Sequence, residues 1–226
     1  KYTPNRMLPD PYEDVDVKEE REKTGAIAAL KQSDVLPVVH VTRLRKVYPA
    51  AKNGLTPEKV AIHDLSLSIE RGTCFGLLGP NGAGKTTAMS ILTGTAWATN
   101  GTASVASSDI HNDIYQIYQK LGFCPQFHGL FPSMTVDEHL TFYGELKGMA
   151  VNNINQFINV LTSNLDMKEH RDKLSKHLSG GNKRKLSMAI SLMGAPDVLI
   201  LDEPSAGIDP SARQNMVNIL KSERKD

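Results

Sequence analysis

One glycine-rich loop constrains the fold of this chain more than any other feature. It reads Gly79-Pro80-Asn81-Gly82-Ala83-Gly84-Lys85-Thr86-Thr87. It follows the apolar run Thr73–Leu78 and leads into Ala88–Leu92. This order predicts a buried strand, a tight loop and a helix, which is the context that a phosphate-binding loop requires.

The residue types in the loop suit phosphate chemistry. Glycines allow backbone N–H groups to turn inward around phosphate oxygens, and the start of the next helix adds its positive dipole end. Lys85 offers a mobile cation for the outer phosphates, and the Thr86 hydroxyl can ligate magnesium. The alternative is a chance glycine turn between strand and helix. We expect residues 79–87 to bind a nucleotide.

Length and charge limit the class of protein. The chain has 226 residues and a formal net charge of +1, which fits one large domain, or a domain plus an arm, and gives no sign of a nucleic-acid partner. No apolar stretch approaches the ~20 residues that cross a bilayer. Any membrane association is therefore expected to come from segments outside this sequence. Cys74 and Cys124 lie in apolar surroundings without CxxC spacing, so we expect both to be buried and reduced.

Hydrophobic patterning predicts two kinds of strand. Apolar residues alternate in Asp64–Ile69, as in a half-exposed strand of an antiparallel sheet. The runs Cys74–Leu78 and Val198–Leu201 are continuously apolar, as in central parallel strands that are covered on both faces. Val38–Thr42 also has strand character. The predicted fold class is α/β with an added antiparallel portion.

Three helices are indicated in the second half of the chain. Thr135 and Glu138 form a capping box, and Gly148 is a stop signal for the helix that follows. A second helix is expected from Asn152 to Asn164. A third is expected from about Asn182 to Met193, with Gly194 after it.

Acidic and amide residues follow two of the predicted strands. Asp202 ends the run Val198–Leu201, so its carboxylate is expected at the sheet edge where ligands bind in α/β folds. Glu203 comes next and could polarise an attacking water, although two acids can also simply cap a strand end. Gln126 follows the short strand Gly122–Pro125. An amide there could ligate magnesium, but a lone Gln after Pro is a weak signal.

Taken together, these motifs resemble the ATP-binding cassette (ABC) family. Its order is phosphate loop, glutamine loop, Ser-Gly-Gly signature, acidic strand end and Asp loop, and the candidates here appear in that order from about Val38 onward. The resemblance implies a P-loop NTPase core with a mixed or parallel sheet, an antiparallel β portion and a helical subdomain. The expected division is an arm at 1–36 and a nucleotide-binding domain at 37–226, with the helical subdomain at about 127–194.

The resemblance also implies roles for residues. ATP and Mg²⁺ are the expected cofactors, with Thr86, Gln126 and Asp202 as magnesium ligands and Glu203, Lys85 and Gln126 as catalytic residues. Tyr48 matches the aromatic residue that stacks on adenine, although a surface or core Tyr is an alternative. The signature Ser179, Gly180 and Gly181 would bind the ATP of a second cassette, so the expected assembly is a head-to-tail pair with two nucleotides between the cassettes.

Four further features, within or beside the motifs, bear on function. Asn182 stands where most members have Gln, and we expect function to survive. The strand that ends near the γ-phosphate-sensing histidine has no counterpart before Asp226, so we expect a C-terminally truncated domain whose activity alone is weak or nil. His128 and His177 are expected to lack chemistry. On charge alone, Lys183-Arg184-Lys185 could be a solvated basic turn of helix, which is the alternative to its being part of a family motif.

Two segments look like subfamily A of the ABC transporters, whose members are associated with lipid movement. These segments are Gly122–Phe127 and Ser179–Ser187. In addition, Glu13–Arg21 resembles the connector before a second cassette. Composition alone allows the charged stretch Glu13–Lys23 to be either a solvated helix or a hydrated connector. The resemblance implies an ATP-hydrolysing domain on the cytosolic face, joined to transmembrane domains. Alternatives are a soluble ABC ATPase of the translation-factor type, a non-hydrolysing regulatory cassette, and a P-loop kinase, against which the signature argues.

Overall fold

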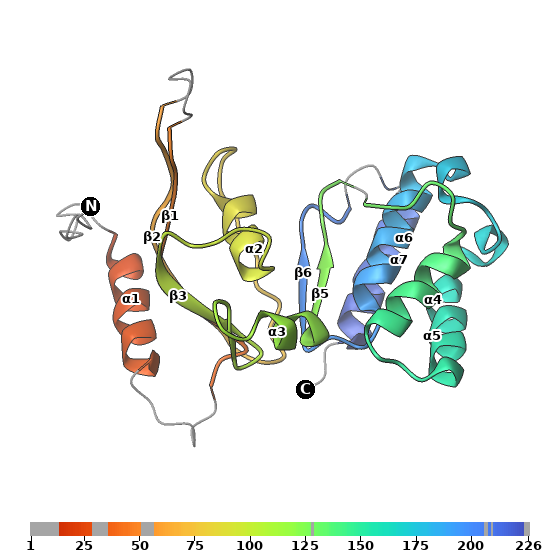
Figure 1. The fold of residues 1–226 in the computed structure, drawn as a ribbon, viewed down its shortest axis with the longest axis horizontal. Helices are drawn as coiled ribbons and strands as arrows, with labels where there is room; N and C mark the ends of the chain where they lie inside the picture. Colours follow the sequence, from red (N-terminus) through yellow and green to blue (C-terminus); the bar gives the residue numbers. More distant parts are fainter. Residues whose placement is uncertain are drawn as a thin grey trace.

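The computed structural model describes residues 14–28, 36–50, 57–127, 129–205, 208 and 210–223. Figure 1 shows an antiparallel sheet with a helix on its outer side, a central pair of parallel strands, and a group of helices beyond that pair. The expected α/β class with antiparallel and helical portions is therefore confirmed.

The antiparallel sheet contains four strands. They are β1 (Val39–Tyr48), β2 (Lys59–Ile69), β3 (Asn100–Val105) and β4 (Ser108–Asp109), in the spatial order β2-β1-β3-β4. Val41 and Leu44 of β1 are fully buried in a cluster that also takes in Ile91 of α2 (Lys85–Leu92). The alternation seen in Asp64–Ile69 does correspond to an antiparallel strand, since β2 pairs with β1 from Val39↔Ile69 onward.

The charged stretch in the arm forms helix α1 (Val15–Ala28), which packs on β1 and β2. A carboxylate oxygen of Glu20 accepts hydrogen bonds from the backbone N–H of Ser68 at 2.8 Å and from its hydroxyl at 3.0 Å. Arg21 lies 3.7 Å from Asp64. The two alternatives predicted for this charged stretch are a solvated helix and a hydrated connector. The helix is correct, but it packs on the sheet rather than lying free in solvent.

The parallel pair consists of β5 (Leu121–Cys124) and β6 (Val198–Leu201). Their register places Cys124 opposite Leu201, so both strands end at the same edge. The backbone N–H of Asp202 donates to the Cys124 carbonyl at 2.9 Å, which extends the pairing by one step. Residues 125–126 and 202–203 therefore leave the sheet side by side.

A strand is predicted for residues 73–78, and this prediction is wrong: these residues form no strand. This segment pairs with no strand among the described residues, so Phe75 and Leu78 remain exposed. A continuous apolar run is buried only when neighbouring strands and helices cover both of its faces. For the same reason Cys74 is exposed, contrary to expectation, whereas Cys124 is buried as expected.

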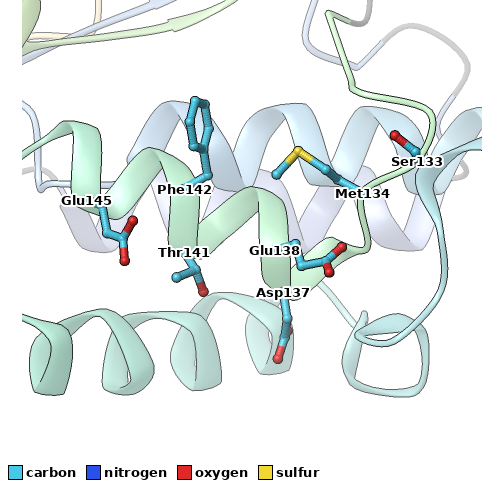
Figure 2. Close-up of a pocket in the computed structure, with 7 residues that line it drawn as sticks. All are labelled: Ser133, Met134, Asp137, Glu138, Thr141, Phe142 and Glu145. Carbon is cyan, nitrogen blue, oxygen red and sulfur yellow. The ribbon is translucent and has the colours of Figure 1, made fainter.

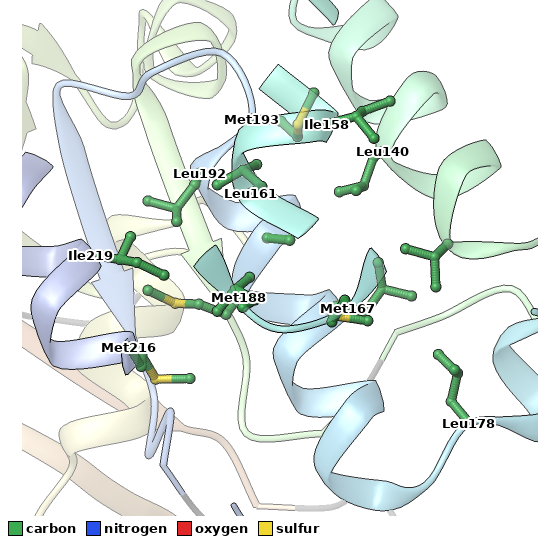
Figure 3. Close-up of a cluster of buried hydrophobic side chains, with 14 of the residues drawn as sticks. Leu140, Ile158, Leu161, Met167, Leu178, Met188, Leu192, Met193, Met216 and Ile219 are labelled. Atoms are coloured by element: carbon green, nitrogen blue, oxygen red, sulfur yellow. The ribbon is translucent and has the colours of Figure 1, made fainter. Parts of the chain in front are cut away.

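The helices from residue 136 onward build a second core (Figure 3). The capping box at Thr135 is confirmed: its hydroxyl accepts from the Glu138 N–H, and the Glu138 carboxylate accepts from the Thr135 N–H. Gly148 and Gly194 adopt positive φ values of 71° and 84°, consistent with their prediction as helix stops. The elements beyond the first sheet are α3 (Ile114–Lys120), α4 (Val136–Leu146), α5 (Val151–Asn164), the 3₁₀ helices η1 (Lys168–His170) and η2 (Ser175–His177), α6 (Gly180–Leu192) and α7 (Pro210–Glu223).

Across the part of the chain that the structure describes, no helix has both the length and the apolar character needed to cross a membrane.

Candidate nucleotide-binding site

The glycine loop turns tightly into α2. Gly82 and Gly84 have φ values of 85° and 90°, a region that residues with a side chain rarely adopt. A Cβ atom at Gly84 would lie only 2.4 Å from the Ala61 carbonyl oxygen of β2. The loop thus needs glycine at position 84 for both its backbone conformation and its close approach to the antiparallel sheet.

Lys85 is the first residue of α2, and its ammonium turns back into the loop. Its Nζ donates to the carbonyl oxygens of Gly79 at 2.7 Å and Pro80 at 3.0 Å. The Ala83 N–H donates to the same Pro80 carbonyl at 3.2 Å. A cation and the start of a helix are therefore held at one turn, which is a suitable arrangement for phosphate oxygens.

Thr86 and Asp202 meet from opposite ends of the sequence. The Thr86 hydroxyl donates to the Asp202 Oδ2 at 3.4 Å, and Asp202 is buried at the end of β6. Hydroxyl and carboxylate oxygens are hard donors of the kind that Mg²⁺ takes together with phosphate oxygens and water. These two side chains fit a magnesium ion shared with a bound nucleotide.

Gln126 and Glu203 form a second contact at the same edge. The Gln126 side-chain N–H donates to Glu203 Oε2 at 3.1 Å. Glu203 is exposed and has a φ of 48°, which is strained for a residue other than glycine. Strained backbone of this kind is concentrated at functional sites.

These residues surround one large cavity between the antiparallel sheet and the β5–β6 pair. Its volume is about 1710 Å³, which exceeds the usual size of a small-molecule pocket. Of the predicted site residues, the lining contains Tyr48, Asn81, Gly82, Gly84, Lys85, Thr86, Thr87, Gln126, Asp202 and Glu203. Gly79, Pro80 and Ala83 belong to the same loop but do not line the cavity.

Tyr48 presents a partly exposed ring at the rim. It is the last residue of β1 and 41% exposed, and the Lys46 ammonium lies 4.8 Å from the ring centroid. A cation over one face of an aromatic ring is a favourable contact. The ring is available for stacking at the cavity, as the resemblance implies.

The signature lies apart from the loop. Ser179 caps α6 by accepting a hydrogen bond from the Asn182 N–H at 3.2 Å, and Ser179 and Gly180 are exposed. Ser179, Gly180 and Gly181 do not line the cavity. Figure 1 shows α2 on one side of the β5–β6 pair and α6 on the other. The two halves of the expected ATP site are therefore not brought together within this chain.

Two residues of the basic turn after the signature are buried, so the alternative of a solvated turn is wrong for Arg184 and Lys185. Arg184 is 1% exposed and Lys185 8% exposed. The Arg184 guanidinium donates to carbonyl oxygens at the ends of both β5 and β6. The spacing held a usable signal: position 184 precedes the buried Met188 by four residues and Ser191 by seven, so all three share one helix face.

Some predicted residues cannot be placed. The segment Ser205–Pro210 is the one that resembles the family's Asp loop, and its Ala206, Gly207 and Asp209 lie outside the described residues, as does His128. His177 is exposed at the end of η2.

Figure 2 shows a second, smaller hollow, which contains none of the predicted site residues. Its volume is about 490 Å³, and acidic and aromatic residues of α4 contribute to its lining. It is lined by Ser133, Met134, Asp137, Glu138, Thr141, Phe142 and Glu145.

Comparison with known families and proteins agrees with this geometry. Residues 62–206 match the family described as ABC transporter. ABC transporter A family member 4 of Arabidopsis thaliana is 41% identical over 94% of this chain. The human retinal-specific phospholipid-transporting ATPase ABCA4 is 40% identical over 93%, and the human cholesterol transporter ABCA5 38% identical over 98%. The chain spans only 22%, 9% and 14% of these three proteins, respectively.

Solved structures support the fold. An ATP-binding subunit of an ABC transporter superposes with a TM-score of 0.75 at 21% identity, over 83% of this chain and 75% of the other. The cassette MJ0796, solved as a dimer in a post-hydrolysis state with ADP and Pi, superposes with a TM-score of 0.74 at 20% identity, over 83% of each chain.

Proposed function

The chain belongs to the ABC transporter family, and on that premise we propose that it is the ATP-binding and ATP-hydrolysing cassette of a membrane transporter of subfamily A. The observation that carries this proposal is the convergence of three motifs, the phosphate loop, the glutamine loop and the acidic strand end, at one sheet edge. Thr86 contacts Asp202, and Gln126 contacts Glu203, although the members of each pair lie 116 and 77 positions apart in the sequence.

The residues at this sheet edge have different roles in the proposed reaction. Lys85 and the loop N–H groups bind and orient the outer phosphates, and Tyr48 supports the adenine ring. Thr86, Asp202 and Gln126 hold magnesium, which when bound neutralises charge on the transferred phosphate. The Glu203 carboxylate accepts a proton from the attacking water, and Gln126 keeps that carboxylate in place through the 3.1 Å hydrogen bond.

A second cassette completes the site in this proposal. The exposed Ser179 helix end lies away from the chain's own loop and is available to an ATP bound by the partner. The helix end offers free N–H groups and a positive dipole to the γ-phosphate. The dimeric state of MJ0796 supports such a pairing.

Coupling to transmembrane domains and movement of a lipid belong to the same proposal. The names of the relatives support it, since two of them are a cholesterol transporter and a phospholipid-transporting ATPase. The cassette would then lie on the cytosolic face, where ATP is available. A soluble ABC ATPase and a non-hydrolysing cassette are the competing functions.

The test uses the full-length protein in lipid nanodiscs, with phosphate release measured under Mg²⁺ and ATP. We expect Glu203→Gln to lower the rate by about 10² to 10⁴-fold while ATP binding is retained, because general-base catalysis contributes on that order. Equal rates for the two proteins would favour the non-hydrolysing cassette. ATP-dependent movement of labelled phospholipid or cholesterol in proteoliposomes tests transport, and a full-length protein without membrane helices would favour the soluble ATPase.

A further inference from the structure

We propose that Arg184 is a positioning residue for ATP hydrolysis: from the signature helix it fixes the backbone at Gln126 and on both sides of Glu203. This inference rests on the proposed function and adds a residue to it. Arg184 lies in α6, four residues after Gly180, and touches neither the phosphate loop nor the cavity.

The guanidinium is buried and all its described contacts are backbone carbonyls. Its Nε donates to the Pro204 carbonyl at 2.9 Å, one terminal nitrogen donates to the Asp202 carbonyl, and the other donates to Pro125 and, at 3.2 Å, to Gln126. Pro125 and Gln126 follow β5, whereas Asp202 and Pro204 follow β6. One side chain therefore joins three elements at the edge where the nucleotide site lies.

The contacts on the β6 side enclose Glu203. The carbonyls of Asp202 and Pro204 precede and follow it, and Glu203 itself has the strained φ of 48°. Strained conformations persist only where the surrounding structure holds them. The two hydrogen bonds from Arg184 supply that restraint.

The contacts on the β5 side reach the partner of Glu203. Gln126 accepts from Arg184 through its backbone carbonyl and donates to Glu203 through its side chain. Arg184 thus holds the backbone of both members of the Gln126–Glu203 hydrogen bond. Losing the guanidinium would leave that hydrogen bond without its common support.

Arginine is suited to this task and lysine is not. The guanidinium carries donors on three nitrogens in a rigid plane, which lets it reach carbonyls of two strands at once. A lysine ammonium keeps the charge but places its donors on a single nitrogen. Arg184→Lys therefore separates positioning from charge.

The experiment measures ATP turnover by the full-length protein with Arg184→Lys, Arg184→Gln and the control Lys183→Gln, which removes a cation from the same turn of α6. The readouts are kcat and KM for ATP, the Kd for a fluorescent ATP analogue in EDTA, and the melting temperature. We expect both Arg184 variants to lower kcat about tenfold or more, with the Kd changed by less than about threefold. Lys183→Gln should behave like the wild type.

A second measurement tests whether Arg184 affects kcat through Gln126 and Glu203. If Arg184 acts through Gln126 and Glu203, combining Arg184→Lys with Gln126→Ala should lower kcat much less than the product of the two single effects. Multiplicative effects would overturn the proposal. So would an unchanged kcat, an equal loss of ATP affinity, or loss of folding in both Arg184 variants. Inactivity of the wild-type protein would instead contradict the proposed function.

Discussion

Gln126 and Glu203 share a hydrogen bond of 3.1 Å between a side-chain N–H and a carboxylate oxygen, at the ends of two paired parallel strands. The amide is uncharged, so it can orient the carboxylate without forming an ion pair with it. We expect Gln126→Ala to lower kcat for ATP hydrolysis about tenfold, the lower end for a hydrogen bond to a charged group because Glu203 is exposed. The measurement is steady-state phosphate release. Gln116→Ala, on the exposed face of α3, should have no effect, and an equal decrease there would contradict the assignment.

Lys85 is the cation of the phosphate loop. Lys85→Ala should weaken ATP binding about 10- to 100-fold, because one or two charge-assisted hydrogen bonds to phosphate are lost. Titration with a fluorescent ATP analogue in EDTA measures this directly. The matched control is Lys176→Ala on η2, far along the chain from the loop. Unchanged affinity for Lys85→Ala would remove the loop from the nucleotide site.

Asp202 lies beside the Thr86 hydroxyl and is proposed to hold magnesium. Asp202→Asn keeps the shape and removes the negative charge, so the Mg²⁺ concentration for half-maximal ATPase activity should rise about tenfold or more. Mg²⁺ titration at fixed ATP gives this value. Asp16→Asn, exposed on α1, serves as the control. A shift in maximal rate with no shift in the Mg²⁺ requirement would be the contrary result.

Thr135 caps α4 and thereby stabilises the helical region. Thr135→Ala should lower the free energy of unfolding by about 1 kcal/mol, as for other N-cap residues. Urea denaturation of the protein is the measurement. Thr141→Ala, within the same helix, should be neutral or slightly stabilising because Ala has the higher helix propensity. If both substitutions gave the same change, the cap would have no special role.

The same capping box predicts that the stability of the folded protein depends on pH. Hydrogen bonds from the Thr135 backbone and side chain lower the pKa of the exposed Glu138 carboxyl below its ordinary range. The folded state thus favours the ionised form, and this stabilisation is present above the unfolded pKa and lost as the pH falls through the folded pKa.

The stability difference between the wild type and Glu138→Gln should therefore shrink as the pH falls from about 6 to below 4. Urea midpoints across this range provide the test. A constant difference over the whole range would show that ionisation of Glu138 does not contribute.

Local sequence patterns anticipated the elements that local interactions decide. The capping box at Thr135, the stops at Gly148 and Gly194 and the antiparallel character of Asp64–Ile69 all follow from caps, glycine conformation and period-two alternation. The prediction failed for residues 73–78, because whether an apolar run becomes a strand depends on partners that the run itself does not specify.

The alternative that Lys183–Lys185 is a solvated turn failed for a related reason. Charge alone favours solvent, and only the carbonyls gathered from β5 and β6 make burial of Arg184 favourable. Order and spacing of motifs were enough to indicate the family and to name the residues of the candidate site. They could not supply the contact of Arg184 with either strand end.

The sequence by itself determined the family, the α/β class and the set of polar residues available for phosphate and magnesium, because these depend on residue type and order along the chain. Only the tertiary structure decided that Gln126 meets Glu203, that Thr86 meets Asp202, and that the Ser179 end of α6 lies apart from the loop. Those relations depend on strand register and on helix packing over long sequence separations, which no local pattern encodes.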